Sequence, residues 1–173
     1  NLGDAVSGNT LEAPSMNPLQ TLRALLVNGE VAALGTLHNG EPAVSMVPYA
    51  LLAEGRGLVI HVSTLAAHTR DMLASPAVSL LVLGVREPGV PVQALPRVTL
   101  QGLAVPCPAA SPEYQEARDQ YLTRYPESEA MFGFADFSLF VIRVRSARLV
   151  AGFAQARTVS AEAFATAFAD QPE

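Results

Sequence analysis

The sequence predicts an α+β domain in which a small antiparallel β-barrel is flanked by short helices. Short apolar runs of strand length follow one another along the chain, and Asn39-Gly40 joins two of them as a hairpin turn. The helical patterns between the runs are also short, and neither an internal repeat nor a long linker divides the chain. We therefore expect a single domain over residues 16–173, preceded by a flexible lead over residues 1–15.

The first predicted elements are a helix and a β-hairpin. N-P-L-Q at residues 17–20 combines an N-cap, a proline at the first helical position and a capping-box glutamine, and N-G at residues 28–29 ends the helix. Two strands follow, over residues 31–37 and 42–51. Because Pro48 has no N–H to donate, we expect an unpaired or bulged position there.

The middle of the chain alternates strands with one helix. LVIHVS at residues 58–63, AVSLLVLG at residues 77–84 and RVTLQGLAV at residues 97–105 are predicted strands. Thr64 is the expected N-cap of a helix over residues 65–74. This helix is expected to turn four side chains inward, those of Leu65, Thr69, Met72 and Leu73.

The last third of the chain adds two helices and one strand. S-P-E at residues 111–113 begins a helix that Pro126 ends, and Ser160 leads a short final helix. The strand between them alternates apolar side chains with Val141, Arg143 and Arg145, so one of its faces is expected to be wet. The predicted core consists of Leu34, Val44, Met46, Leu58, Ile60, Leu80, Val82, Val98, Leu100, Phe140 and Ile142.

Composition excludes several classes of function. The net charge is −5 with no basic run, so nucleic acid is an unexpected partner, and no apolar run reaches the roughly 20 residues of a membrane span. The chain has no lysine for Schiff-base chemistry. Its single cysteine, Cys107, excludes an internal disulfide and is typical of the reducing cytoplasm, where we expect the protein. The three histidines form no H-x-x-x-H pair, and we predict no metal site.

One segment, IHVSTLAAHTRDM, gathers polar groups where a strand passes into a helix. His61 and Ser63 end the strand, and His68 and Arg70 lie in the first turns of the helix. Helix-start amides and a guanidinium both favour an anion such as a phosphate. The alternative is that Arg70 is a solvated surface arginine and His68 a satisfied polar side chain; the residues alone leave both readings open.

Four segments in order resemble the pyridoxamine 5′-phosphate oxidase superfamily, the FMN-binding split barrels. GEPAVSMVPYA, LVIHVSTLAAHTRDM, SPAVSLLVLG and RVTLQGLA follow the family's order of flavin-contacting strand, phosphate segment, packing strand and dimer strand. HVSTLAAHTRDM, RVTLQG and FADFSLFVIRVRSARLVAGF are closer still to the haem-utilisation branch. The resemblance spans about residues 20 to 157. It implies a six-stranded antiparallel split β-barrel and a homodimer with FMN at the subunit interface.

The resemblance also implies cofactor-binding positions. The family's flavin-contacting strand falls on residues 45–50, its phosphate grip on residues 66–68, and its pair near the cofactor on His61 and Val62. Arg97 stands where the family places a glutamine that reaches the FMN of the partner subunit. The cofactor-binding residues implied in this way are Ser45, Met46, Val47, Pro48, Tyr49, His61, Val62, Ser63, His68, Arg70 and Arg97.

Departures from the family pattern fall on its charged positions. The strand's arginine is Ser45 here, its terminal lysine is Ala50, and the Ser-Arg of the grip is Ala66-Ala67. Phosphate binding would then depend on Arg70, His68 and Ser63. Pyridoxamine phosphate oxidase activity is therefore not expected, because neutral side chains cannot replace the charged contacts.

Three functions remain open. The leading prediction is an FMN-binding flavoprotein, an oxidoreductase of unidentified substrate in which no catalytic residue can be assigned. The second, also implied by the resemblance, is haem binding or degradation. That branch often carries a further C-terminal domain with a haem-ligating histidine, whereas here no histidine follows His68, and His38, His61 or His68 would bind haem weakly. The third is a non-enzymatic ligand-binding or stress module.

Overall fold

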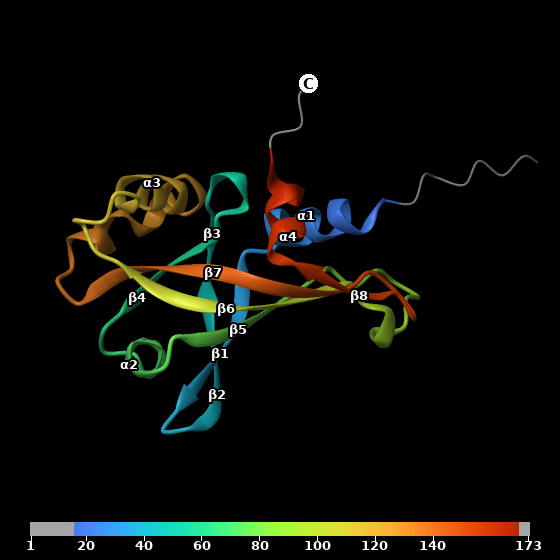
Figure 1. Ribbon diagram of the computed structural model, residues 1–173, viewed down its shortest axis with the longest axis horizontal. Helices are drawn as coiled ribbons and strands as arrows, with labels where there is room; N and C mark the ends of the chain where they lie inside the picture. Colours follow the sequence, from blue (N-terminus) through green and yellow to red (C-terminus); the bar gives the residue numbers. More distant parts are fainter. Residues whose placement is uncertain (1–15, 170–173) are drawn as a thin grey trace, which may run out of the picture.

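The computed structural model describes residues 16–169, so the predicted lead over residues 1–15 lies outside the described residues. One antiparallel sheet forms the domain, with helices packed along it (Figure 1). In chain order the elements are α1 (Pro18–Asn28), β1 (Val31–His38), β2 (Glu41–Pro48), β3 (Ala50–Leu51), η1 (Ala53–Gly55), β4 (Leu58–Ser63), α2 (Ala67–Ala74), β5 (Ala77–Leu83), η2 (Val92–Ala94), β6 (Arg97–Cys107), α3 (Tyr114–Arg124), η3 (Pro126–Gly133), β7 (Phe137–Val150), β8 (Ala156–Ser160) and α4 (Ala161–Phe168).

The order of strands shows how the sheet curls into a half-barrel. Neighbouring strands follow the order β2-β1-β5-β6-β7-β4-β3, and β8 adds to β7. β2 and β3 therefore occupy opposite ends of the path although one residue separates them in the chain. Only a sheet that curves back on itself brings those ends together, which confirms the predicted α+β split barrel. The six predicted runs all form strands, and β8 is a strand that the sequence analysis missed.

The predicted strand over residues 42–51 is divided into two, but the break lies at Tyr49; Pro48 itself ends β2 in register with Val31, so the unpaired position expected at Pro48 is wrong by one residue. β2 pairs with β1, whereas β3 pairs with β4, so the chain changes partners at Tyr49. The Tyr49 side chain is fully buried, and its hydroxyl donates to the carbonyl oxygen of Leu26 at 2.7 Å. The Tyr49 carbonyl oxygen accepts from the Tyr125 hydroxyl at 2.8 Å. The position of Tyr49, where the chain changes partners, is therefore fixed through both its side chain and its backbone.

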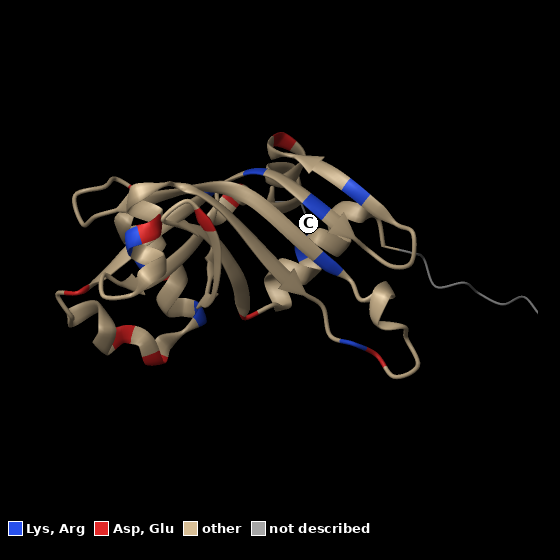
Figure 2. Ribbon diagram, turned by 90° about the horizontal axis from the view of Figure 1, so that it is seen from below, with Lys and Arg blue, Asp and Glu red and all other residues tan. Residues whose placement is uncertain are grey.

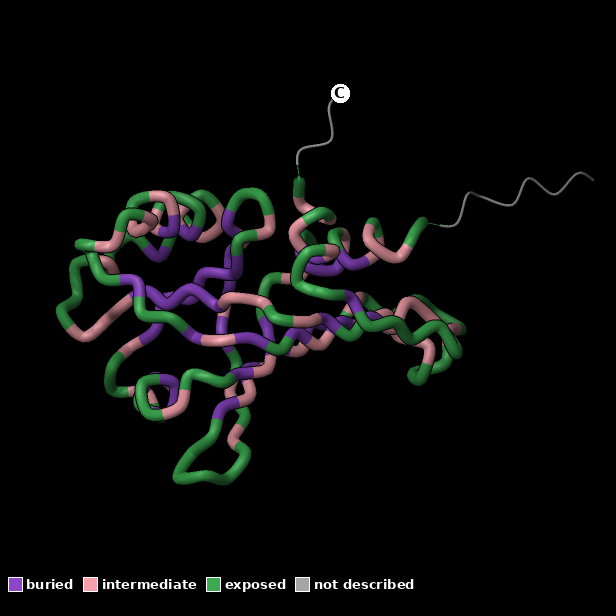
Figure 3. The backbone as a smooth tube through the Cα atoms, in the orientation of Figure 1, coloured by how far each residue is buried: buried purple, intermediate pink, exposed green. Residues whose placement is uncertain are grey.

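Two apolar clusters stabilise the curled sheet. Figure 3 shows in purple where buried residues follow one another along the strands. The larger lies between the sheet and helices α1 and α4, and includes Leu22, Leu26 and Phe164. The smaller lies under α3, where Ala117 and Tyr121 pack on β4 and β7. Nine of the eleven predicted core side chains are buried: Leu34, Leu58, Ile60, Leu80, Val82, Val98, Leu100, Phe140 and Ile142.

The core prediction is wrong for Val44 and Met46, which are 76% and 63% exposed. They lie opposite Gly35 and Ala33 of β1, and directly opposed residues share a face of an antiparallel pair. The inward face of β2 instead carries Ser45 and Val47. β2 makes its main contacts with β1 and β4, so within the described residues no helix covers the outer side of these apolar residues.

Helix α2 is shorter and more polar inside than predicted. Its N-cap is Ala66, which makes no side-chain cap, so the expected Thr64 cap is wrong. Leu65 and Leu73 are exposed, whereas Thr69, Asp71 and Met72 are buried. Polar side chains therefore attach this helix to the sheet.

The other helices follow their predicted signals. Asn17 and Gln20 form the capping box of α1, and the Ser160 side chain accepts from the Ala163 N–H at the start of α4. The wet face predicted for β7 begins only at Arg143, because Val141 is buried beneath α3. Within residues 16–169, no helix has the length and apolar character needed to cross a membrane.

Candidate functional site

The turn between β4 and α2 is held by Ser63. Its hydroxyl donates to Asp136 Oδ2 at 2.9 Å and accepts from the Leu65 N–H at 3.1 Å. Its carbonyl oxygen accepts from the Thr69 hydroxyl at 2.6 Å. These bonds fix the start of α2 against the end of the strand. Ser63 is thus already engaged in the local structure of the segment where the sequence indicated an anion site.

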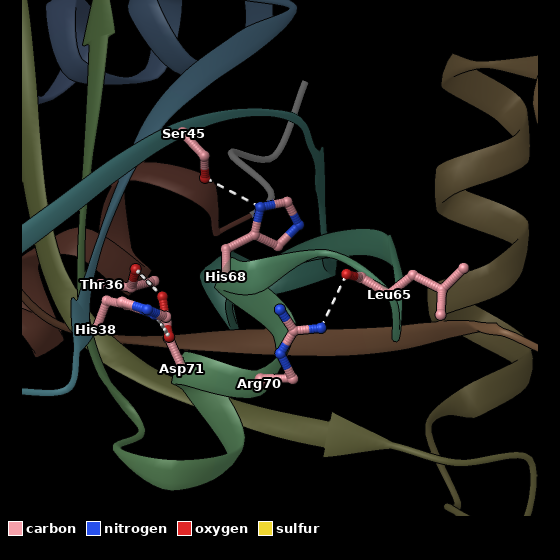
Figure 4. A network of polar contacts seen from close by, with 7 residues as sticks. All are labelled: Thr36, His38, Ser45, Leu65, His68, Arg70 and Asp71. Carbon is pink, nitrogen blue, oxygen red and sulfur yellow. Dashed lines mark hydrogen bonds and ion pairs between the residues drawn. The ribbon is translucent and has the colours of Figure 1, made fainter.

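Asp71 connects α2 to the β1–β2 hairpin (Figure 4). Its Oδ2 accepts from the Thr36 hydroxyl at 3.0 Å, and its Oδ1 lies 2.7 Å from His38 Nδ1. The carboxylate is buried, and the hydrogen bond from His38 is the main cause that lowers its pKa, with a further contribution from Thr36. The His38 side chain is 50% exposed. An ionised carboxylate therefore orients a solvent-facing imidazole.

Ser45 and His68, both predicted site residues, meet across the gap between β2 and α2. The Ser45 Oγ lies 3.1 Å from His68 Nδ1 (Figure 4). Burial is the main cause that lowers the pKa of His68, opposed by the charge of Asp71. The structure therefore brings these two residues together and, with Asp71, makes three side-chain links between α2 and the hairpin strands.

Arg70 is exposed, and its guanidinium donates to the carbonyl oxygen of Leu65 at 3.0 Å. Figure 4 shows this bond, which ties the guanidinium to the loop before α2. Its other N–H groups face solvent and remain donors for an anion. The geometry is thus compatible with either reading of Arg70.

His61 lies in a different environment from the other predicted residues. Its ring stacks on Phe132 at a centroid distance of 3.9 Å and contacts Tyr121 and Phe137. Burial lowers its pKa to about 4, and Nδ1 has no hydrogen-bond partner among the described residues. Val62, its neighbour in β4, points into the larger core instead. The two implied cofactor residues therefore occupy opposite faces of the strand.

The remaining implied positions are dispersed. Arg97 begins β6 and donates to the carbonyl oxygens of Gln93 and Leu95, within its own loop. Val47 and Tyr49 are buried, Pro48 is half-buried, and Met46 is exposed on the outer face of β2. Within one subunit, the structure groups Ser45, Ser63, His68 and Arg70 around α2 and leaves Arg97 at the far end of the sheet from this group.

Thr36 and Asp71 are polar residues that the sequence reasoning left without a role at this site, and His38 was considered only as a weak haem ligand. Asp71 lies 33 positions from His38 in the chain, so no local spacing reveals the pair. The sequence offered one signal for this pair. Asp71 lies directly before Met72, which was predicted to face inward, and a carboxylate that is buried in this way needs a hydrogen-bonding or charged partner. Among the described residues, no group of three or more His, Cys, Asp or Glu side chains forms a metal cluster.

The family of the chain follows from a match over most of its length. A family model described as pyridoxamine 5′-phosphate oxidase matches residues 19–151. The chain belongs to the pyridoxamine 5′-phosphate oxidase family. The expectation drawn from the four sequence segments is therefore confirmed.

Relatives within and around this family carry haem-related names. The chain is 34% identical over 155 residues to the non-canonical heme oxygenase HOZ of Arabidopsis thaliana, a chloroplastic protein, covering 87% of this chain and 46% of the relative. A heme binding protein from Mycobacterium smegmatis is 29% identical with a TM-score of 0.79, over 89% of this chain and 62% of that one. The heme storage protein HutZ of Vibrio cholerae shares the fold at 21% identity, with a TM-score of 0.67 over 75% and 91% of the two chains. The chain thus spans about half the length of the curated relative.

Proposed function

We propose that this member of the pyridoxamine 5′-phosphate oxidase family binds haem, with haem degradation as its reaction. The observation that carries the proposal is the 34% identity with a heme oxygenase over 87% of the chain. The replacement of the family's charged phosphate residues by Ser45, Ala50 and Ala66-Ala67 also favours haem over FMN. The second prediction of the sequence analysis therefore takes precedence over the first.

The β1–β2 hairpin carries a histidine that can serve as a ligand of haem iron. A ligating histidine commonly donates its second ring N–H to a carboxylate, which fixes the tautomer and raises the basicity of the other nitrogen. With Nδ1–H donated to Asp71, His38 presents Nε2 as its free lone pair on a side chain that is 50% exposed. His61 is buried in an aromatic cluster, and His68 is engaged with Ser45. We therefore assign the ligand role to His38; bound haem would supply a redox-active iron.

A homodimer is part of the proposal. At the end away from the β1–β2 turn, the outer face of β2, β1 and β5 exposes large apolar side chains, among them Val31, Met46 and Leu83. Exposed apolar patches of this kind mark interaction sites, and stable homodimers bury on the order of 2,000 Å² or more. Sedimentation of the protein at micromolar concentration should give the mass of a dimer.

The cytoplasmic location stays a prediction that depends on the single Cys107.

FMN remains the second candidate because Arg70 and the start of α2 still present donors that an anion would accept. The test is an absorbance titration of the purified protein with haemin and, separately, with FMN. We expect a saturable Soret band with haemin, weaker binding of FMN, and loss of the Soret band when ascorbate is added to the complex in air. Saturable FMN binding without a haemin complex would restore the flavoprotein as the leading function.

A further inference from the structure

A groove crosses the outer face of the sheet where β1, β2, β5 and β6 run side by side. Its volume is about 430 Å³. This lies within the range of roughly 300–1,000 Å³ of small-molecule sites. Most of its lining is apolar or glycine, from Gly35, Leu37, Val44 and Val78, and the charged lining residue is Arg145. The groove therefore combines an apolar floor with one cation.

Arg145 lies at a β-bulge beside this groove. The pairing of β6 with β7 passes from Gln101–Ser146 to Gly102–Val144, which leaves Arg145 as the extra residue without a partner. A bulge redirects the side chain of the extra residue. Gly102 permits this close approach, since a Cβ there would collide with the carbonyl oxygen of Arg143.

The charge of Arg145 is uncommitted within the described part of the chain. Its neighbours on β7 are engaged: Arg143 pairs with Glu113 and donates to the Arg56 carbonyl oxygen, and Arg148 donates to the Thr158 hydroxyl. Arg145 is exposed and belongs to none of the ion pairs found in residues 16–169.

Acidic residues are scarce on the sheet that surrounds Arg145. Figure 2 shows them mainly on helices and loops, while arginines mark the long strands. Glu41 is the one acidic position in the described strands, and it does not line the groove. An anionic ligand would thus meet a favourable charge there although the whole chain carries a net charge of −5.

We propose that this groove binds a carboxylate of a tetrapyrrole, with the Arg145 guanidinium paired to a propionate and the apolar floor against the ring. The inference rests on the proposed haem function and deepens it, since it assigns the residue that recognises the acidic edge of the ligand.

The experiment separates carboxylate recognition from iron ligation. Metal-free protoporphyrin IX and its dimethyl ester, which lacks both carboxylates, are titrated by fluorescence against the wild type, Arg145→Ala and the matched control Arg148→Ala. A charge-assisted hydrogen bond contributes roughly 1.5–3 kcal/mol, so Arg145→Ala should bind the free acid about 10- to 100-fold more weakly. Arg148→Ala should match the wild type, and Arg145→Ala should no longer distinguish acid from ester. Arg145→Lys should recover part of the loss, and thermal melts with elution volumes check folding and assembly.

The outcomes for the two proposals are distinct. A wild type that forms a haemin complex while Arg145→Ala binds the free acid equally well overturns the groove assignment and leaves haem binding intact. A wild type that binds neither haemin nor protoporphyrin overturns the proposed function together with the groove assignment. A preference of the wild type for the ester over the acid also overturns the role of Arg145.

Discussion

Two histidines of this protein, in the β1–β2 hairpin and beneath α3, show how surroundings assign different roles to one residue type. His38 is half-exposed and hydrogen-bonded to a buried carboxylate. His61 is buried against Phe132 with an unpartnered Nδ1. The carboxylate orients the first ring, whereas burial lowers the pKa of the second ring and keeps it neutral. Burial of a histidine is therefore not by itself a sign of a haem ligand. The better sign is a ring nitrogen that is both oriented by a hydrogen bond and accessible to the ligand.

The largest expected effect is a pH-dependent loss of folding stability caused by the buried His61 ring. The pKa of His61 falls from 6.5 in the unfolded chain to about 4 in the folded protein, so the unfolded state takes up a proton first as the pH drops. Stability should be complete above pH 6.5 and decrease by about 3 kcal/mol on going to pH 4, at 1.36 kcal/mol for each pKa unit. Urea unfolding at several pH values measures this change.

A matched pair of variants sharpens that comparison. His61→Phe keeps the aromatic packing and removes the titrating group, so its stability should decline less between pH 6.5 and pH 4 than that of the wild type. His38→Gln should retain the decline. Equal pH profiles for wild type and His61→Phe would contradict the assignment of this pH range to His61.

The pKa of Asp71 is lowered mainly by the hydrogen bond from His38, so the stability that Asp71 contributes should be lost only below pH 3.8.

The exposed ring should control haem affinity. Replacing a residue that orients a metal ligand typically lowers affinity or activity about 10- to 100-fold, so Asp71→Asn should weaken haemin binding by this factor and His38→Ala by at least as much. The Soret maximum should also shift in His38→Ala, a change that mere loss of packing would not produce. His61→Phe is the control. An unchanged Soret maximum in His38→Ala would remove His38 as the ligand.

A smaller effect is expected at the start of α2. If FMN binds there, Arg70→Ala should weaken FMN binding by about 10-fold, the lower end for a charge-assisted hydrogen bond, because the side chain is exposed. Arg86→Ala, in an exposed loop, is the matched control for loss of a positive charge. Haemin affinity should change in neither variant. Equal FMN titrations for the two variants would exclude Arg70 as a phosphate contact.

The smallest effect is expected for the Ser45–His68 link. Ser45→Ala removes one neutral hydrogen bond that is only partly buried, so it should lower the free energy of unfolding by about 1 kcal/mol or less. Urea unfolding at pH 7.5 measures it, with Ser79→Ala as a second strand serine of similar exposure. A loss above about 3 kcal/mol would mean that the hairpin region depends on this pair far more than its geometry implies.

Local signals predicted most of the fold and less of the site. The capping box at Asn17, the Asn39-Gly40 turn and the strand break directly after Pro48 each depend on a few residues, and each appears in the structure. Val44 and Met46 show the limit, because their alternation identifies a strand face but not whether another layer covers it. The partners of Asp71 are set by the curvature of the sheet, which the sequence pattern does not contain.

Tyr49 has a consequence for how the domain opens. Since one residue connects the strand paired to β1 with the strand paired to β4, and the Tyr125 hydroxyl holds its carbonyl oxygen, neither edge of the sheet can separate without moving the other. Local opening in proteins occurs in cooperative units that follow such connections. We therefore expect the hairpin that carries His38 and the edge beneath α3 to exchange their amide hydrogens as a single slow unit. A ligand bound on one of them would protect both.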